Sequence, residues 1–253
     1  MSTVVSVLTT KDGQGSTSLA LSLAWTAAER RRVMAIDADM SGTGTMADLL
    51  ALDFGSRGIG NLFGTMDVSG FMLEQQAVSV RGRPRLRLVP GLQGFCGPGV
   101  VELLPRLAPA LSVLPEELVL LDLGAALAHP RQESPRRTGQ VIAEVSNRVL
   151  VVLHDSPARL VKSIQILKAA QLPQAELVVY ESRRGALRDQ ILRTIGEHLP
   201  GHRVSALLPW DERRALKAED SAVPPSVPGL LHSLRLAEPA RAAGEANGRE
   251  SGR

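Results

Sequence analysis

The strongest constraint on the fold of this chain is a regular alternation between short apolar runs and longer segments with helical spacing. Several of the short runs, among them Leu118–Leu121 and Val149–Leu153, are apolar at every position. Strands that helices cover on both faces have this pattern, because neither face meets water. We therefore expect an α/β fold of three layers, in which helices flank a mostly parallel central sheet.

The pattern assigns most of the chain to strands and helices. The expected strands are Val4–Leu8, Val33–Ile36, Leu86–Val89, Leu118–Leu121, Val149–Leu153, Leu177–Tyr180 and Val204–Leu208. The expected helices are Leu19–Glu29, Val100–Leu111, Gln140–Val145, Pro157–Gln171, Ala186–His198, Glu212–Glu219 and Leu230–Leu236.

One domain accounts for most of the sequence. The 253 residues are 44% hydrophobic and 22% charged, which is enough apolar material for one sizeable core. No stretch with the composition of a linker divides residues 1–236, so we expect a single domain there. Residues 237–253 are mostly Ala, Gly, Glu and Arg without a large apolar side chain, and we expect a disordered tail.

The composition favours a cytoplasmic protein. Cys96 is the single cysteine, which excludes an internal disulfide framework. The N-terminus lacks the basic region of a signal peptide, and the sequence has no apolar run long enough to span a membrane. The apolar segment Leu230–Leu236 is followed by Pro239 and a polar tail, so we expect no stable membrane binding through it.

The loop after the first expected strand has the composition of a phosphate-binding turn. Small residues in this loop let backbone N–H groups point at one spot, where the next helix adds the positive end of its dipole. Thr17, the first hydroxyl of that helix, stands where P-loop proteins place a Mg²⁺ ligand. The alternative is an ordinary glycine turn in which Ser16 or Thr17 caps the helix.

A family resemblance rests on this loop and on landmarks that follow it in order. Lys11-x-Gly13-x-Gly15-x-Thr17 resembles the deviant Walker A loop of the ParA/MinD family. Residues 32–39 resemble the strand that ends in the Asp-x-Asp of switch I, and residues 118–126 resemble the Walker B strand followed by switch II. Residues 149–157 resemble a later strand and loop, and residues 207–211 resemble the Ile-Pro-x-Asp element near the adenine.

The resemblance implies a P-loop NTPase fold that binds ATP or ADP with Mg²⁺. It implies that Thr17 and Asp122 hold the metal ion and that Asp39 orients the attacking water. Lys11 resembles the family's signature lysine, which reaches the partner's nucleotide in an ATP-bound homodimer. The residues that the resemblance places at the nucleotide are Lys11, Asp12, Gly13, Gln14, Gly15, Ser16, Thr17, Ser18, Tyr180, Pro209 and Asp211.

Three positions depart from the family pattern, and each departure acts against tight ATP binding. Ser16 stands in place of the lysine that contacts the β- and γ-phosphates. The loss of one charge-assisted hydrogen bond weakens binding by roughly tenfold to a hundredfold. Asp12 replaces a glycine beside the anion site, and Tyr180 falls near the position of an adenine-binding Asn.

Within the family, the altered loop is most similar to the CpaE/TadZ-type branch. That resemblance implies a dimeric, nucleotide-linked positioning protein that acts on a protein cargo or adaptor, for example at a pilus or division site, with weak or absent ATPase activity. Two alternatives to this function remain. The first is a scaffold that binds no nucleotide, and the second is an active ATPase that is completed by a residue from elsewhere in the dimer.

A run of arginines leads into the expected strand Leu86–Val89 and suggests that the strand extends toward Arg81. Arg81, Arg83, Arg85 and Arg87 alternate with small or apolar residues, while the net charge of the whole chain is only +3. One interpretation is an edge strand protected by charge and proline. The other is a contact surface for DNA or an acidic partner.

Overall fold

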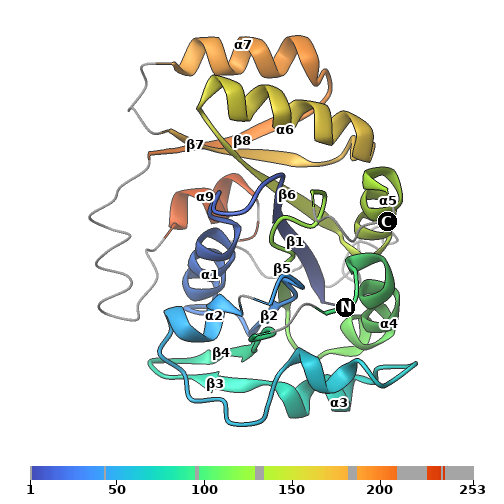
Figure 1. Cartoon of the computed structure of the whole chain (residues 1–253). Helices are drawn as coiled ribbons and strands as arrows, with labels where there is room; N and C mark the ends of the chain where they lie inside the picture. The colour runs from blue at the N-terminus through green and yellow to red at the C-terminus, as the bar shows by residue number, and fades with distance from the viewer. Residues whose placement is uncertain are drawn as a thin grey trace, which may run out of the picture.

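An eight-stranded sheet runs through the centre of the protein in the computed structural model (Figure 1). The structure describes residues 2–42, 44–94, 97–128, 134–181, 187–209, 227–234 and 236. The strand order is β3-β4-β2-β5-β1-β6-β7-β8, and every described pairing is parallel except that of β3 with β4. The strands are β1 (Thr3–Thr9), β2 (Val33–Asp37), β3 (Val78–Val80), β4 (Arg83–Val89), β5 (Leu118–Asp122), β6 (Arg148–His154), β7 (Glu176–Glu181) and β8 (Arg203–Pro209).

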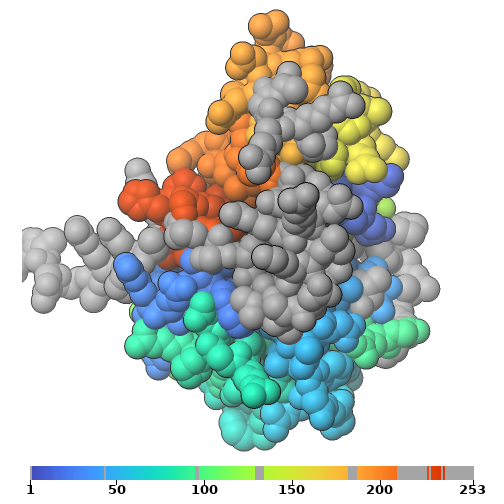
Figure 2. All heavy atoms as spheres, turned by 90° about the vertical axis from the view of Figure 1, so that its left-hand side faces the viewer, coloured from blue at the N-terminus to red at the C-terminus, as the bar shows by residue number. Residues whose placement is uncertain are grey.

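Helices cover both faces of this sheet, which confirms the three-layer α/β fold. Successive residues of β1 point to opposite faces: Val4 and Leu8 join one apolar cluster, and Val5 and Val7 join the other. The first cluster includes α3 (Gly70–Gln76), α4 (Val100–Val113), α5 (Pro135–Val145), α6 (Pro157–Ala170) and α7 (Arg188–His198). The second includes α1 (Ser16–Ala27), α2 (Thr45–Leu49) and α9 (Pro228–Ser233). Figure 2 shows the red atoms of α9 at the surface, above blue atoms from the first part of the chain.

The order of the strands determines where a ligand site can form. β1 lies between β5 and β6, so the chain leaves β1 toward one half of the sheet and later returns to build the other half. At such a switch point, the loops that follow neighbouring strands diverge and leave a crevice at the carboxyl ends of the strands. The loop that precedes α1 lies at this crevice.

Several short elements between β2 and α4 were not expected from the sequence. They are α2, the 3₁₀ helix η1 (Ile59–Leu62), α3 and β3. Each has at most seven residues, which is too short for a periodic pattern to distinguish it from a loop. The expected helix Glu212–Glu219 and the expected tail, residues 237–253, lie outside the described residues.

The arginine-rich strand is not an edge strand, so that interpretation is wrong. β3 pairs along the outer side of β4. Arg83 forms an ion pair with Glu29 at 3.2 Å and lies 4.5 Å from the ring centroid of Trp25. Arg87 forms an ion pair with the buried Glu116. Arg83 and Arg87 are thus partly buried and paired with glutamates of the fold, whereas Arg85 of the same strand is exposed.

No helix in the part of the chain that the structure describes has both the length and the apolar character needed to span a bilayer.

Alanine substitutions at two helical glycines test the packing of α5 against α6. Gly139 lies in α5, and Gly196 in α7 serves as the control. A Cβ on Gly139 would lie 2.2 Å from the carbonyl oxygen of Ala170, whereas a Cβ on Gly196 would meet nothing within 4 Å. We expect Gly139→Ala to lower the free energy of unfolding by about 1–3 kcal/mol through overpacking. The matched Gly196→Ala should raise it by about 0.5–1 kcal/mol, because alanine favours a helix interior. Urea unfolding measures both, and a stabilised Gly139→Ala variant would show that the two helices are not in close contact.

Candidate functional site

The loop between β1 and α1 presents a row of backbone N–H groups without acceptors. Gly13 and Gly15 have φ angles of 73° and 89°, which glycine adopts without steric cost. Within the described part of the chain, the N–H groups of residues 13–18 donate to no backbone or side-chain acceptor. α1 begins at Ser16 and adds the positive end of its dipole at the same place. The loop is therefore suited to receive an anion.

Two buried carboxyl groups lie at the adjacent strand ends. The register of β2 and β5 places Asp37 opposite Asp122, and neither residue is exposed. Asp37 accepts the N–H of Met46 at 3.1 Å and that of Asp39 at 3.4 Å. Oδ1 of Asp122 accepts the N–H of Gly124 at 3.1 Å, while its Oδ2 is buried without a hydrogen-bond partner among the described residues.

Burial changes the protonation of these two acids. Burial, together with the negative charge of Asp122, raises the pKa of Asp37 to about 8. Burial likewise raises the pKa of Asp122 to about 6, although the hydroxyl of Thr17 acts in the opposite direction. An acid with a raised pKa takes up protons on folding, so this burial costs more stability as the pH rises from the ordinary value of 3.8 toward 8. A cation beside Asp122 would offset part of that cost.

Gly124 is the point at which three segments meet. Its φ is 53°, and its carbonyl accepts the N–H of Thr9 at 2.8 Å. A Cβ on Gly124 would lie 2.4 Å from the carboxyl group of Asp39, so Asp39 packs directly on this backbone. Asp39 also accepts the N–H of Ser41 at 2.9 Å. Three segments therefore meet at Gly124, which has no side chain. They are the end of β1, the end of β5 and the start of the segment after β2.

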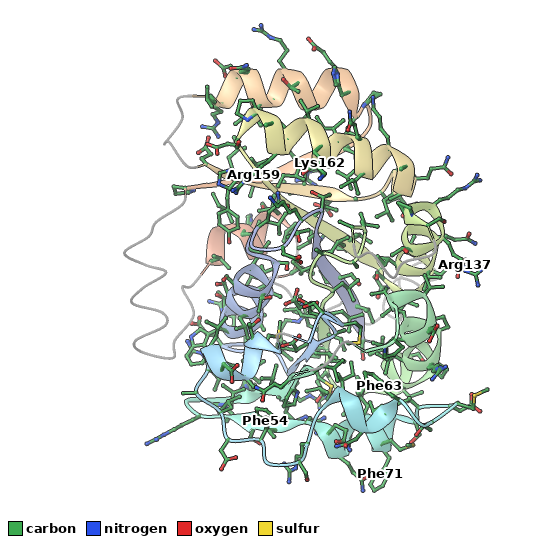
Figure 3. All side chains as sticks on the ribbon, in the orientation of Figure 1. Phe54, Phe63, Phe71, Arg137, Arg159 and Lys162 are labelled. Carbon is green, nitrogen blue, oxygen red and sulfur yellow. The ribbon has the colours of Figure 1, made fainter. Side chains whose placement is uncertain are left out.

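A cavity of about 210 Å³ opens beside this meeting point. Its charged lining consists of Lys11, Asp12, Asp39 and Lys162. The sequence indicated the first three, and the fold brings them together. Lys162 was missed, because it lies on α6, far along the chain, where an exposed helical lysine carries no signal of its own. Figure 3 labels Lys162 on the side of α6 that faces the loop before α1.

A side-chain hydrogen bond ties α6 to the same loop. The hydroxyl oxygens of Thr10 and Ser163 lie 2.5 Å apart, and both side chains are buried. The Thr10 hydroxyl also donates to Oε1 of Gln14 at 3.3 Å. Gln14 is 4% exposed, and its Nε2 has no hydrogen-bond partner in the described chain. The loop and the first half of α6 are thus held together as one unit.

Tyr180 packs directly on the loop. A Cβ on Gly15 would lie 3.2 Å from Cε2 of Tyr180, so the ring rests against this glycine. Burial raises the pKa of Tyr180 to about 12. Pro209 ends β8 next to this position, in register with Glu181. Asp211, which the resemblance also placed at the nucleotide, lies outside the described residues.

The groups at this site fit a phosphate group with a Mg²⁺ ion. The N–H groups of residues 13–18 match phosphate oxygens, and the buried Oδ2 of Asp122 is an orphaned hard ligand near the Thr17 hydroxyl. No group of three or more His, Cys, Asp or Glu side chains in the described residues forms a metal cage. Mg²⁺ keeps several waters and binds through few protein ligands plus phosphate, so such a cage is not required.

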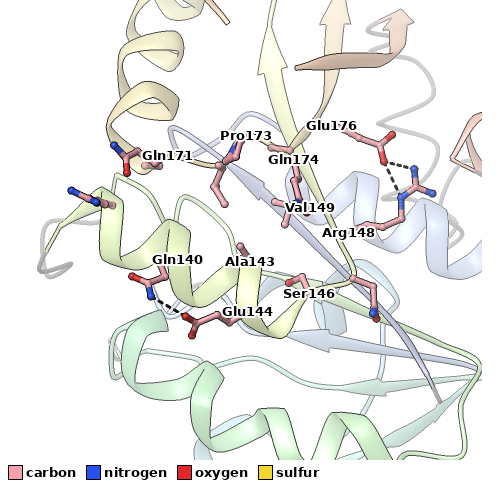
Figure 4. A pocket seen from close by; sticks show the side chains of 15 residues that line it. Gln140, Ala143, Glu144, Ser146, Arg148, Val149, Gln171, Pro173, Gln174 and Glu176 are labelled. Atoms are coloured by element: carbon pink, nitrogen blue, oxygen red, sulfur yellow. Dashed lines mark hydrogen bonds and ion pairs between the residues drawn. The ribbon is translucent and has the colours of Figure 1, made fainter. Parts of the chain in front are cut away.

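A larger cavity, of about 570 Å³, lies at the opposite end of the sheet (Figure 4). It is lined by the amino ends of β6 and β7, by α5 from Arg136 to Glu144, and by the end of α6 with the segment that follows it. Its charged side chains are partly engaged with each other, since Arg148 forms an ion pair with Glu176. Ligands of open parallel sheets bind at the carboxyl ends of the strands, so this cavity is not the candidate site.

No protein-family model and no curated protein matches the chain. Solved structures do match. A ParA family ATPase from Chlorobium tepidum TLS has a TM-score of 0.68 at 16% identity, over 92% of each chain. The MinC:MinD cell division protein complex of Aquifex aeolicus contributes a chain with a TM-score of 0.68 at 14% identity, over 88% of this chain and 87% of that one. The septum site-determining protein MinD complexed with Mg-ADP, from Pyrococcus horikoshii OT3, has a TM-score of 0.63 at 14% identity, over 94% and 95%. The chain therefore has the three-layer P-loop NTPase fold of the ParA and MinD ATPases.

Proposed function

We propose that this chain is a member of the ParA/MinD family and acts as a nucleotide-linked positioning protein with a weakened phosphate site. In this proposal it forms a homodimer in the cytoplasm and carries or recruits a protein cargo or adaptor. The altered loop favours the CpaE/TadZ-type branch. The fold shared with ParA and MinD ATPases supports the family, and the site chemistry supports the nucleotide.

The observation that carries the proposal is that backbone N–H donors and a carboxylate oxygen lie at the same edge of the sheet without hydrogen-bond partners. The backbone N–H groups of residues 13–18 and the buried Oδ2 of Asp122 all lack partners in the described structure. Of these groups, Oδ2 of Asp122 is buried, and a buried polar group without a partner costs about 1–3 kcal/mol. A ligand that supplies a cation to this oxygen and an anion to the loop amides would therefore stabilise the fold.

The residues of the site then take separate roles. The loop amides bind the phosphates, while Thr17 and Asp122 hold Mg²⁺, which would neutralise charge on the transferring phosphoryl group. Asp39, fixed by the N–H of Ser41, would orient the attacking water. Lys11 is exposed on the loop. In this proposal it contacts the nucleotide of a second copy.

Two residues of the loop are expected to weaken the binding of ATP. Ser16 is 5% exposed and carries no charge where P-loop ATPases place a lysine. Asp12 adds a negative charge next to the phosphate amides. Weak ATP binding and slow or absent hydrolysis are the expected result.

Tyr180 favours one alternative, a scaffold that binds no nucleotide. Its ring rests on Gly15 and so fills space directly over the loop. If the ring stays there, a nucleotide cannot approach this part of the loop as closely as in an ordinary P-loop ATPase. The scaffold would then act only through protein contacts.

The metal pair is tested by two conservative substitutions. Thr17→Ala and Asp122→Asn should each remove most of the dependence of ATP affinity on Mg²⁺. The first deletes the hydroxyl ligand, and the second removes the negative charge and one of the two carboxylate oxygens. Isothermal titration with ATP, with and without Mg²⁺, measures the effect. Ser112→Ala, which removes an exposed hydroxyl on α4, serves as the control. An unchanged Mg²⁺ dependence in both site variants contradicts the nucleotide-site proposal.

The effect of the missing lysine in the loop is tested by introducing a lysine at position 16. Ser16→Lys should strengthen ATP binding by about 1.5–3 kcal/mol, or roughly tenfold to a hundredfold, and should leave AMP binding unchanged. Asp12→Gly should add to the gain by removing a like charge, without strict additivity within one short loop. ATP and AMP titrations of the single and double variants measure both effects. If the double variant binds ATP no better than the parent, the scaffold alternative is preferred.

A further inference from the structure

Lys162 on α6 is a cation that the loop sequence did not reveal. It lines the 210 Å³ cavity together with Lys11, and neither lysine forms an ion pair within the described part of the chain. Exposed lysines commonly face water, but two of them that line one small cavity, one from the loop and one from α6, place like charges close together. An anion bound between them relieves that repulsion and gains from both charges.

The charge balance of the cavity depends on Lys162. The charged lining has two lysines, Lys11 and Lys162, and two aspartates, Asp12 and Asp39, so its formal charge is zero. Without Lys162 the same lining would hold one lysine and two aspartates, a formal charge of −1. A phosphate would then approach a negative surface, and the loop amides alone would have to overcome that repulsion.

The fold holds Lys162 in place relative to the loop. Its neighbour Ser163 is buried and hydrogen-bonded to Thr10, the residue immediately before Lys11. The backbone of α6 is therefore anchored at this point, while the long lysine side chain can still adjust. Such an arrangement suits a point charge that contacts a phosphate oxygen without a fixed bidentate geometry.

The position of the cavity indicates which end of a nucleotide Lys162 would meet. Val100 and Leu123, also in the cavity lining, belong to the apolar cluster on the α4–α6 face of the sheet. Tyr180, which lies at the position matched to the adenine contact, packs against the cluster on the α1 face. Lys162 is thus on the side of Asp39 and Ser41, where the water-orienting carboxylate stands, and away from the base.

We propose that Lys162 supplies, from α6 of the same chain, the phosphate-binding charge that the loop lacks at Ser16, and that it contacts the terminal phosphates of the bound nucleotide. The inference rests on the proposed nucleotide site. It assigns the missing charge to the same chain rather than to a dimer partner.

The test compares two lysines of the same helix in the full-length protein. Lys162→Ala should weaken ATP affinity by roughly tenfold to a hundredfold, because a charged hydrogen bond to phosphate is lost. AMP affinity should stay within about twofold, since an exposed charge far from the ligand contributes little. Lys168 lies in the last turn of α6 and lines a different groove, beside Leu172 and His198. Lys168→Ala should therefore leave both affinities within about twofold. Thermal melting of each variant verifies that it is folded.

A rescue separates a phosphate contact from a merely structural effect. Ser16→Lys introduced into Lys162→Ala should restore ATP affinity, and its gain should exceed the gain in the parent, because both lysines serve one phosphate group. If Lys162→Ala matches Lys168→Ala while the parent binds ATP, the inference is wrong and the nucleotide site stands. If the parent binds neither ATP nor ADP with Mg²⁺, the proposed function and this inference both fail.

Discussion

The structure depends on two carboxyl groups buried side by side at the ends of β2 and β5. Asp37 and Asp122 face each other in strand register, and neither is exposed. Each is held by backbone N–H groups of the segment that follows its strand, from Met46 in one case and Gly124 in the other. These bonds fix both segments, but they leave one oxygen of Asp122 unsatisfied. Desolvation and mutual repulsion make the arrangement costly in the absence of a cation, which is the physical basis for treating this edge of the sheet as a ligand site.

The layers of the fold could be predicted from the sequence, because a strand covered on both faces must be apolar at every position. Leu118–Leu121 and Val149–Leu153 met that condition, and both are central strands. The region between β2 and α4 could not be predicted in the same way. α2 begins where Asp37 accepts the N–H of Met46, and β3 exists only because it pairs with β4. These short elements owe their form to tertiary contacts rather than to their own periodicity.

The candidate site was predictable to the extent that it is local in sequence. The glycines of the loop and the acids at the strand ends stand in recognisable positions, and the structure brings them to one edge. Lys162 and Ser163 belong to α6, and only the fold shows that they lie next to the loop. The arginines of β4 illustrate the same limit, because the glutamates that engage them, Glu29 and Glu116, come from distant segments.

The contact between Tyr180 and Gly15 has a practical consequence for observing the protein in solution. Tyr180 is the single tyrosine of the chain, so its ring resonances can be assigned without ambiguity in a magnetic resonance spectrum. The ring lies directly on the loop, where any ligand that seats on the amides alters its magnetic environment. The chain therefore carries an intrinsic label at its own binding loop, and the rate at which that ring flips reports how tightly the loop is packed.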